Sequence, residues 1–437
     1  MKIVLTAPAT EMSEYGGNHA IAFGAGFPKP WFIQRKLLLN TFYIPVPRVV
    51  GFQAKYAPLG LRRIEASLIE SGFFHPDDIA IVHPDDLEEA VGKDTRVVGI
   101  GAKDPLGLGY VSLTYSTLLG LGDPMNRYEF LYLMNKIRRL KRKYRFHVVL
   151  GGPGTWQITR FINPGKLGID VVIEGEGEGV APAVFAKLVQ NEPIKPVVRS
   201  NWVRVEDIPI IRGASIYGAV EISRGCGRGC QFCTPTMQVK RSFPLEKILY
   251  DVSINLGMGQ DKILLVTEDL YLYGSRVPWE PNADAVRRLI NRIIEMKLYG
   301  LRYLQVTHLN LATAYYRRDL TKWVAEKLYE FAWYKLNGRP IVTVEVGIET
   351  GSPRLIANYM IGKPKPYKPE DWPRIVLESL IFMEEHDWVP LGTIIVGLPG
   401  ETLEDALATL RLIEDIEAHG LKTFLVPLLF IPLGQSM

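Results

Sequence analysis

The sequence predicts an α/β protein with two domains, each built from parallel strands joined by helices. Short runs of β-branched residues alternate with helical patterns along the whole chain, which is typical of parallel sheets with crossover helices. A length of 437 residues exceeds that of one ordinary folding unit. Residues 191–216, NEPIKPVVRSNWVRVEDIPIIRGASI, contain prolines and lack a clear period, so we expect an interdomain linker there.

The first domain, residues 1–190, is expected to contain a parallel sheet. Its predicted strands are Lys2–Thr6, Ile79–His83, Arg96–Gly101, His147–Leu150 and Asp170–Glu174. The loops GAKDPLG, GGPG and EGEGEG follow the third, fourth and fifth of these strands. Because ligands of open α/β sheets bind beyond the carboxyl ends of the strands, the three loops are expected to line one crevice. The alternative is that the glycines only permit tight turns between strand and helix.

The second domain, residues 217–437, repeats the alternation from Ala219 onward. Its predicted strands are Ala219–Ser223, Lys262–Thr267, Arg302–Thr307, Val342–Gly347, Gly392–Gly397 and Thr423–Ile431. Helical patterns between them include Pro281–Met296, Leu320–Lys335 and Leu403–Ala418. Six strand–helix units predict a partial (β/α)6 barrel, with its chemistry at the carboxyl ends of the strands.

Composition and charge exclude several classes of protein. Hydrophobic residues make up 47% and charged residues 22%, an ordinary globular mixture, and no apolar run reaches the length of about 18 residues that spans a bilayer. The N-terminus, MKIVLTAPATEMSEYGG, is typical of a first strand and not of a signal peptide. A net charge of +4 gives no indication of a nucleic-acid partner. We therefore expect a soluble, cytoplasmic protein. The basic residues from Lys136 to Arg145 favour a solvated helix face over a docking patch for an acidic partner.

Three cysteines, Cys226, Cys230 and Cys233, lie within eight residues, directly after the first predicted barrel strand. Three closely spaced thiolates can hold three irons of a cubane iron–sulfur cluster and leave the fourth iron open. Glycines 225, 227 and 229 allow the loop to wrap closely. A structural zinc site needs a fourth ligand, and the chain offers neither a fourth cysteine nor a histidine near this loop. One iron–sulfur cluster is therefore favoured over zinc and over inert buried cysteines.

The C-x3-C-x2-C spacing after the first strand of a six-unit barrel resembles the radical S-adenosylmethionine (SAM) superfamily. The resemblance implies one [4Fe–4S] cluster and SAM, which is cleaved to a 5′-deoxyadenosyl radical with an electron from an external donor such as a ferredoxin or flavodoxin. Phe232 matches the aromatic position beside the adenine. Thr267 and Glu268 occupy the place of the family segment that binds the SAM amino group, with Val-Thr-Glu in place of Gly-Gly-Glu. Glu349 and Ser352, in VGIETGS, complete the implied SAM-binding set, with Glu349 near the ribose hydroxyls.

The first domain resembles the Rossmann-like cobalamin-binding domain that precedes one large class of radical SAM enzymes. The implied contacts are Lys103, Asp104, Pro105 and Leu106 beneath the corrin, Gly151, Gly152 and Pro153 along the nucleotide tail, and Glu174, Gly175 and Glu176. Cobalamin domains that ligate cobalt through histidine carry Asp-x-His-x-x-Gly after the first strand. Here that loop is ThrAlaProAlaThrGlu, so we expect cobalt without a histidine ligand.

Both resemblances together imply a class B-type methyltransferase. One SAM would methylate cobalamin, and a second would give the radical that abstracts hydrogen from an unactivated carbon of the substrate. The chain ends just after the sixth predicted barrel strand, where this class carries a C-terminal extension. Either residues are missing there, or the substrate or a partner covers the opening. With a resemblance to archaeal members of the class, this favours a protein substrate, and thus a post-translational modification. The specific hypothesis is C-methylation of a glutamine in methyl-coenzyme M reductase.

Three alternatives remain open. A radical SAM enzyme of this architecture can couple lipid carbons or form rings without using cobalamin. Methylthiolation is disfavoured, because those enzymes use a second cluster with its own three cysteines and this chain has three in total. A corrinoid-binding sensor without catalysis would bind cobalamin but would not cleave SAM, and the complete cluster motif disfavours it.

Overall fold

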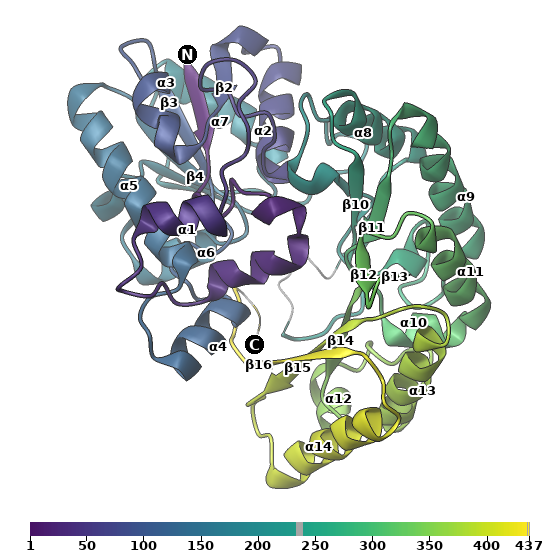
Figure 1. Cartoon of the computed structure of the whole chain (residues 1–437). Coiled ribbons are helices and arrows are strands. Elements are labelled where there is room, and N and C mark those ends of the chain that lie inside the picture. The colour runs from purple at the N-terminus through teal and green to yellow at the C-terminus, as the bar shows by residue number, and fades with distance from the viewer. Residues whose placement is uncertain (233–238, 435, 437) are drawn as a thin grey trace. The chain divides into compact units, whose positions relative to one another are not determined.

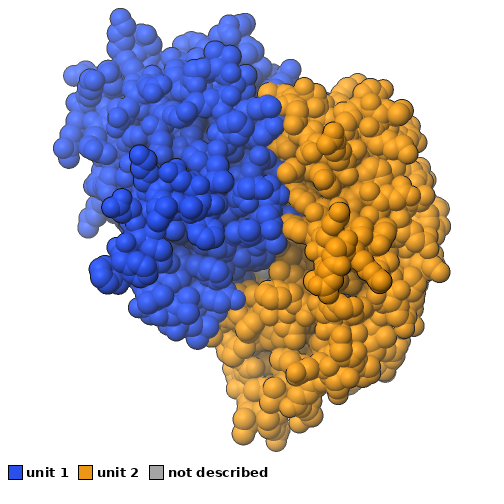
Figure 2. Space-filling view, in the orientation of Figure 1, with its two compact units in different colours: residues 1–217 blue, residues 218–437 orange. Residues whose placement is uncertain are grey.

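The computed structural model describes residues 1–232, 239–434 and 436. The chain divides into two compact units of residues 1–217 and 218–437 (Figure 2). Within the described residues, no helix combines the length and the apolar character that a membrane span requires.

Unit 1 contains one parallel sheet of six strands in the order β2-β1-β3-β4-β5-β6 (Figure 1). The strands are β1 (Ile3–Thr6), β2 (Ile79–Ile81), β3 (Val97–Gly101), β4 (His147–Gly151), β5 (Val171–Glu174) and β6 (Val197–Arg199). The helices are α1 (Arg35–Thr41), α2 (Leu59–Glu70), α3 (Leu87–Ala90), α4 (Tyr110–Leu119), α5 (Met125–Lys143), α6 (Thr155–Phe161) and α7 (Ala181–Val189). The chain continues from β1 to one side and from β3 to the other, so the loops after β1 and β3 flank the switch point where doubly wound sheets bind ligands.

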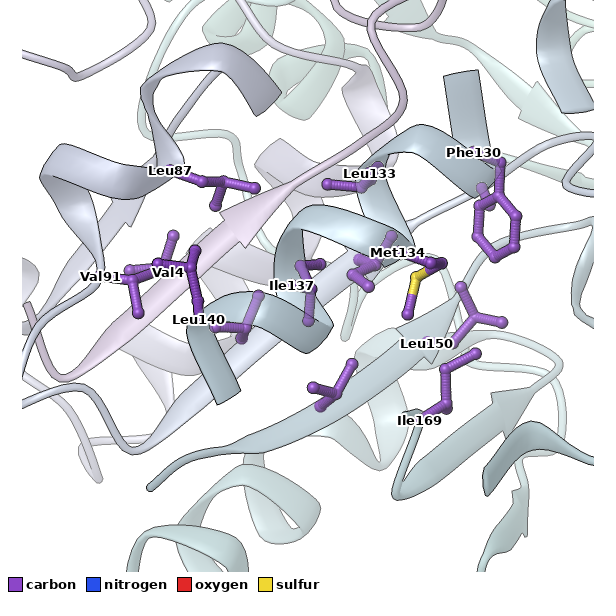
Figure 3. Close-up of a cluster of buried hydrophobic side chains, with 14 of the residues drawn as sticks. Val4, Leu87, Val91, Phe130, Leu133, Met134, Ile137, Leu140, Leu150 and Ile169 are labelled. Carbon is purple, nitrogen blue, oxygen red and sulfur yellow. The ribbon is translucent and has the colours of Figure 1, made fainter. Parts of the chain in front are cut away.

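The main core of unit 1 lies between the sheet and α5 (Figure 3). Apolar residues recur along α5 every three or four positions, at Phe130, Leu133, Met134, Ile137 and Leu140, and all are buried. This stripe packs on strand residues such as Val4 and Leu150.

The basic run on α5 does not form one solvated face. Lys136 is buried, and its ammonium group donates to the carbonyl oxygens of Pro84 at 3.1 Å and Asp85 at 3.0 Å. Arg139 and Arg142 are exposed. The helical period separates the members of the run, so that some hold the fold and others meet solvent.

Residues 191–216, for which the sequence predicts a linker, belong to unit 1. Val197–Arg199 forms β6, which pairs in parallel with β5. Ile208 and Ile211 are fully buried, and the carbonyl of Ala214 accepts from the guanidinium of Arg62 in α2 at 3.0 Å. The apolar residues here have no regular spacing because they fill gaps beside α2, and no secondary-structure period reports that kind of burial.

Unit 2 contains six parallel strands, as the sequence predicts. One sheet has the order β11-β10-β7 and another β14-β15-β16. A parallel bridge between His308 and Glu345 joins them, with Glu345 N–H donating to Thr307 at 2.9 Å and Leu309 N–H donating to Glu345 at 3.0 Å. The strands are β7 (Ala219–Glu221), β10 (Lys262–Val266), β11 (Tyr303–Val306), β14 (Glu345–Glu349), β15 (Leu391–Val396) and β16 (Phe424–Leu429). The resulting arrangement is a partial barrel.

The helices of unit 2 follow its strands along the chain and lie along one side of them (Figure 1). They are α8 (Leu245–Gly257), α9 (Ala283–Ile294), α10 (Leu311–Tyr316), α11 (Arg318–Tyr329), α12 (Pro353–Tyr359), α13 (Trp372–Glu384) and α14 (Leu403–Ala418). Helix α14 has the bounds that the sequence predicts, because Thr402 and Asp405 form a capping box at its start. The sequence did not predict two short antiparallel strand pairs: β8 (Ser223–Arg224) with β9 (Arg241–Ser242), and β12 (Tyr334–Leu336) with β13 (Arg339–Ile341).

Candidate functional site

The cysteine loop begins where β7 ends and is closed at its base by the β8–β9 pair, in which Ser223 faces Ser242 and Arg224 faces Arg241. Gly225 has a left-handed φ of 73°, and a Cβ there would lie 2.1 Å from the carbonyl oxygen of Val239. Only glycine can therefore occupy the start of the loop. The β8–β9 pair thus fixes both ends of the cysteine loop.

Two of the three predicted cluster ligands lie in the described part of this loop. Cys226 is half-buried and Cys230 is buried, and burial raises the pKa of both thiols, that of Cys230 to about 11. The backbone N–H of Arg228 hydrogen bonds to Cys226, and the ammonium group of Lys363 favours the thiolate of Cys230. N–H donors and a nearby cation are what sulfur ligands of a cluster need, so this loop fits an iron–sulfur cluster. Cys233 lies outside the described residues.

Arg228, between the two cysteines, is a feature that the sequence did not single out. Its side chain is buried, and one guanidinium nitrogen donates to the carbonyls of Gly362 at 2.9 Å, Lys363 at 3.0 Å and Lys365 at 3.3 Å. The other terminal nitrogen pairs with Asp269 at 3.5 Å. The cysteine loop is thus fastened to a segment more than 130 residues later in the chain.

Asp269, the partner of Arg228, is itself buried and hydrogen-bonded. Burial raises the pKa of its carboxyl group, and Arg228 and the hydroxyl of Thr313 oppose that shift. The Thr313 hydroxyl donates to it at 3.1 Å. Asp269 directly follows Thr267 and Glu268, so the segment that the sequence singled out contains one residue that anchors the loop.

The two predicted SAM contacts after β10 differ in their surroundings. The hydroxyl of Thr267 is buried and lies 2.6 Å from the hydroxyl of Ser223. Glu268 is half-buried, and its charge raises the pKa values of Cys226 and of His308, which places it near both. Glu268 therefore has the position of a carboxylate beside the cysteine loop, whereas Thr267 joins two strand ends.

His308, after β11, is a further ionisable group at this end of the barrel. Its Nε2 lies 2.9 Å from the carboxylate of Glu345. Burial lowers its pKa, but the hydrogen bond and charge of Glu345, with the charge of Glu268, raise it overall to about 9. The imidazole is therefore protonated at neutral pH and adds a positive charge near Glu268.

Glu349 stands at a backbone irregularity. The register of β14 against β15 shifts between Gly347 and Glu349, and Glu349 has a left-handed φ of 64°. Its buried carboxylate pairs with Lys363 at 2.9 Å and accepts from Thr393 at 3.3 Å. A Cβ at Gly347 would lie 2.1 Å from that carboxylate, so the glycine leaves room for the pair. Such bulges redirect side chains and are frequent next to active sites.

Ser352 is placed differently from Glu349. It is buried, accepts from the backbone N–H of Leu355 as the N-cap of α12, and donates to Asp405 at 2.5 Å. Its hydroxyl is thus engaged within the protein. Phe232 is half-buried at the end of the described part of the cysteine loop.

In unit 1 the structure brings together the loops after β3 and β4. Ala102 N–H donates to Gly151 at 3.0 Å, and Gly154 N–H donates back to Ala102 at 3.0 Å. The side-chain amide of Gln157 accepts from Leu106 N–H and donates to Asp104, both at 2.7 Å. Pro105 is packed so closely that a Cβ at Gly154 would lie 2.3 Å from its ring. The two predicted loops are therefore one hydrogen-bonded unit.

The backbone at Gly151 and Gly152 offers two different environments. A Cβ at Gly151 would meet no atom within 4 Å. Gly152 has a φ of 102°, and a Cβ there would lie 2.6 Å from the carbonyl oxygen of Ala102. Gly151 thus presents open backbone on which a ligand can lie, whereas Gly152 is required by the fold. The neighbouring Pro153 is exposed.

The two glutamate side chains of the predicted cobalamin set, and the backbone of Lys103, are engaged within the protein. Lys103 N–H donates at 2.8 Å to Glu11 of the β1 loop, whose pKa burial raises to about 7. Glu174 accepts from Thr159 at 2.5 Å and from Arg199 at 3.1 Å. Glu176 is buried and accepts from Val203 N–H at 2.8 Å. Next to it, a Cβ at Gly175 would lie 2.4 Å from Ser200. These contacts fix the shape of the carboxyl edge of the sheet.

Solved structures with a similar fold include the radical SAM methyltransferase TsrM from Kitasatospora setae, determined with tryptophan substrate and a SAM analogue. The match has a TM-score of 0.62, 14% identity, and covers 99% of this chain and 75% of that one. TsrM with cobalamin and a [4Fe–4S] cluster bound matches with a TM-score of 0.62 and 15% identity over 99% and 77% of the two chains. The likeness shows that this chain has the same fold.

The curated relatives match over shorter lengths. The ribosomal protein uS12 methylthiotransferase RimO of Thermotoga sp. is 28% identical over 239 residues, 54% of this chain and 49% of its own length. The tRNA-2-methylthio-N(6)-dimethylallyladenosine synthase of Fusobacterium nucleatum is 25% identical over 255 residues, 57% and 52% of the two lengths. The chain therefore spans about half the length of the curated relatives that it matches.

The family model of the radical SAM superfamily matches residues 220–413. This range includes the cysteine loop and every strand from β10 to β15. This agrees with the partial barrel and with the cysteines at its first strand. A domain of this superfamily carries a [4Fe–4S] cluster and uses SAM. Unit 2 of this chain is a domain of the radical SAM superfamily.

Proposed function

We propose that the chain is a cobalamin-dependent radical SAM methyltransferase that methylates an unactivated carbon. The observation that carries the proposal is a single chain holding a cysteine loop at the barrel of unit 2 and an open glycine edge on the parallel sheet of unit 1. When bound, the cluster supplies the electron that cleaves SAM, and cobalamin supplies the methyl group.

In unit 2, Cys226, Cys230 and Cys233 are the proposed ligands of one cluster. Glu268 is the proposed acceptor for the ammonium group of SAM, because it is a half-buried carboxylate near Cys226. Glu349 would accept from the ribose hydroxyls, and Phe232 would pack beside the adenine. Thr267 and Ser352 are engaged with Ser223 and Asp405, so we propose that they shape the SAM site through those contacts.

In unit 1 the proposed cobalamin site is the edge formed by the loops after β1, β3 and β4. Gly151 would lie along the nucleotide tail, since its backbone has open space beside it, and residues 103–106 would lie beneath the corrin. Gly152, Pro153 and residues 174–176 would form the wall of the tail channel. The residues fit cobalamin because the end of β4 is lined by glycine and leaves open space at Gly151 for the nucleotide tail.

We propose that no histidine nitrogen ligates the cobalt. His83 follows β2, next to β1 in the sheet, but its Nδ1 accepts from Asp85 N–H at 3.2 Å, so Nε2 carries the proton and has no lone pair to offer. Electron paramagnetic resonance of the Co(II) protein tests the point. A spectrum without nitrogen superhyperfine splitting is expected, and splitting from an axial nitrogen would contradict the assignment.

Methylthiolation is the competing activity that the relatives suggest, since both relatives described above are named as methylthio-transferring enzymes. The second cluster of such enzymes needs three further cysteines, and the first 225 residues of this chain contain none. We therefore propose methyl transfer. Iron and sulfide analysis separates the two, with about four of each per chain expected for one cluster.

We propose that the substrate is a residue of a protein, because the sequence resembles archaeal members of the class. The specific hypothesis is a glutamine of methyl-coenzyme M reductase. Mass spectrometry of that reductase from cells with and without this protein tests it, and loss of one methyl group from glutamine is expected in cells without it. An unchanged methylation pattern would remove the reductase as substrate.

Two other readings predict different cofactor behaviour. An enzyme that couples lipid carbons or closes rings would cleave SAM without needing cobalamin, and a sensor would retain cobalamin without cleaving SAM. Anaerobically purified protein should retain corrinoid and, with a strong reductant or a reduced ferredoxin, should also form 5′-deoxyadenosine. Formation of 5′-deoxyadenosine without bound corrinoid would favour the coupling or ring-closing enzyme. Bound corrinoid without 5′-deoxyadenosine would favour the sensor.

A further inference from the structure

The segment Asn358–Lys365, which comprises the last two residues of α12 and the six residues after it, is hydrogen-bonded to the cysteine loop through its backbone carbonyls. Gln231 N–H donates to the Tyr359 carbonyl at 2.9 Å, and the Gln231 amide donates to the Asn358 carbonyl at 3.2 Å. The guanidinium of Arg228 donates to three more carbonyls of the segment, those of residues 362, 363 and 365. A Cβ at Gly362 would lie 1.9 Å from the carbonyl oxygen of Arg228, so the two backbones are in direct contact.

The segment also contributes a buried cation, the ammonium group of Lys363, which pairs with the predicted SAM contact Glu349. The side chain of Lys363 is 8% exposed, and its ammonium group pairs with Glu349 at 2.9 Å and lies 5.7 Å from the ring centre of Trp372. Glu349 sits at the bulge of β14 with a left-handed backbone, a conformation that needs support from its surroundings. Lys363 therefore pairs with the carboxylate of a residue whose backbone is left-handed, while its own carbonyl accepts from Arg228 of the cysteine loop.

We propose that Lys363 is a positioning residue of the radical SAM site, which holds Glu349 in place and adds a fixed positive charge beside the cluster. A positive charge in a buried site favours the reduced, more negative form of a cluster and so raises its reduction potential. The carboxylate of Glu349 acts in the opposite direction. The inference rests on the cluster of the radical SAM domain and not on methyl transfer.

The two charges of the pair make opposite predictions. In the anaerobically reconstituted full chain without SAM, Lys363→Met should shift the midpoint potential of the cluster to a more negative value, and Glu349→Gln should shift it to a more positive value. Lys363→Arg keeps the charge and should leave the potential near that of the wild-type protein. Lys363→Met should also raise the Kd for SAM roughly tenfold, because it leaves a buried carboxylate without its partner.

Lys365→Met is the matched control. It makes the same chemical change two residues away, where the ammonium group lies 4.6 Å from the ring centre of Trp279, and any side chain keeps the carbonyl that Arg228 contacts. The midpoint potential of the cluster in Lys365→Met should stay near the wild-type value. An unchanged potential in Lys363→Met, or a shift of the same sign in Lys363→Met and Glu349→Gln, would overturn the proposal.

If Lys363→Met fails to bind a cluster, the variants Lys363→Gln and Lys363→Arg test whether a positive charge is needed at this position. Recovery of the cluster with Arg but not with Gln supports the need for a charge, and recovery with both at equal potential overturns it. Since these measurements need only the cluster, a protein that holds it but transfers no methyl group would refute the proposed function and leave this inference standing.

Discussion

The two units hold their functional loops by different physical means. In unit 1 the loops after β3 and β4 are joined by backbone hydrogen bonds, and glycines at 152, 154 and 175 allow backbones to approach so closely that a Cβ would clash. In unit 2 the cysteine loop is held by buried charge pairs, Arg228 with Asp269 and Lys363 with Glu349. Both sites are therefore sensitive to added atoms, at Gly225 and Gly362 in unit 2 as well as at the glycines of unit 1, but the site of unit 2 is in addition sensitive to lost charges.

The largest expected effect is on the cluster itself. Replacing Cys226, Cys230 and Cys233 together by alanine should abolish iron and sulfide binding, because no other cysteine exists to replace them. Metal analysis and the visible absorption spectrum measure the loss. Circular dichroism and corrinoid retention by unit 1 should stay as in the wild-type protein, and a cluster that survives in the triple variant would refute the assignment.

The next largest effect concerns the buried pair of unit 2. Arg228→Met leaves Asp269 buried and unpaired, which should lower the free energy of unfolding by about 3–5 kcal/mol. Denaturant unfolding of the chain measures it. Arg292→Met is the control, since its pair with Glu295 is more than half exposed and should contribute less than about 1 kcal/mol. Equal effects of the two substitutions would show that the buried pair contributes no more to stability than an exposed one.

In unit 1 the neighbouring glycines should separate folding from binding. Gly152→Val would force a side chain onto the backbone of Ala102 at a φ of 102°, so it should lower the free energy of unfolding by about 2–3 kcal/mol. It is therefore not a test of the tail channel alone. Gly151→Val places its side chain in open space and should abolish corrinoid retention with little change in stability. Corrinoid bound as tightly by Gly151→Val as by the wild type would contradict the proposed path.

A smaller effect is expected for Glu268. Glu268→Ala should weaken SAM binding by about 1.5–3 kcal/mol, the contribution of a charge-assisted hydrogen bond, without loss of the cluster. Isothermal titration with the reconstituted protein gives the affinity, and iron content serves as the control. Unchanged affinity would show that another group holds the SAM ammonium.

The smallest effects concern pH, and they fall in different ranges for the two units. Burial raises the pKa of Glu11 in unit 1 to about 7, above its ordinary 4.5, against the opposing charge of Lys103. Because the folded state binds this proton more tightly than the unfolded state, the stability it contributes is full below pH 4.5 and is lost as the pH rises to about 7. Glu11→Gln should remove this decline, which denaturant midpoints at about pH 5 and about pH 8 would show.

His308 in unit 2 follows the same rule at higher pH. Its pKa is raised from 6.5 to about 9, so the stability contributed by its pair with Glu345 is present below pH 6.5 and is lost as the pH rises through about 9. His308→Gln should flatten the unfolding midpoint over that range. A wild-type midpoint that is constant from pH 6.5 to about 9 would refute the role of the pair.

Much of the fold could be predicted from the sequence because its information is local. All five strands predicted for unit 1 and all six for unit 2 have structural counterparts, since runs of β-branched residues bounded by turns report strands directly. The partial barrel followed from the order of those strands. The spacing of the cysteines likewise indicated a cluster before any geometry was known, because three thiolates within eight residues can reach one cluster.

Other features depend on contacts between residues far apart in sequence. The strand β6 and the buried residues around Ile208 fall in the predicted linker, and only the pairing of β6 with β5 and the contacts of residues 209 and 214 with α2 show that this segment belongs to unit 1. The two sheets of unit 2 meet at the bridge between His308 and Glu345, which no periodic pattern encodes. Burial of an irregular segment is decided by the shape of its neighbours, and that shape exists only in the folded chain.

The candidate site divides in the same way. The chain determined by itself which side chains can ligate iron or accept from SAM, since thiolates and carboxylates carry their chemistry wherever they lie. Only the tertiary structure decided that Arg228 reaches the carbonyls of residues 362–365, that Lys363 meets Glu349, and that Gly151 is open while Gly152 is closed. The physical reason is that charge pairing and close backbone approach act over a few ångströms in space, and residues separated by more than a hundred positions meet at that range only after folding.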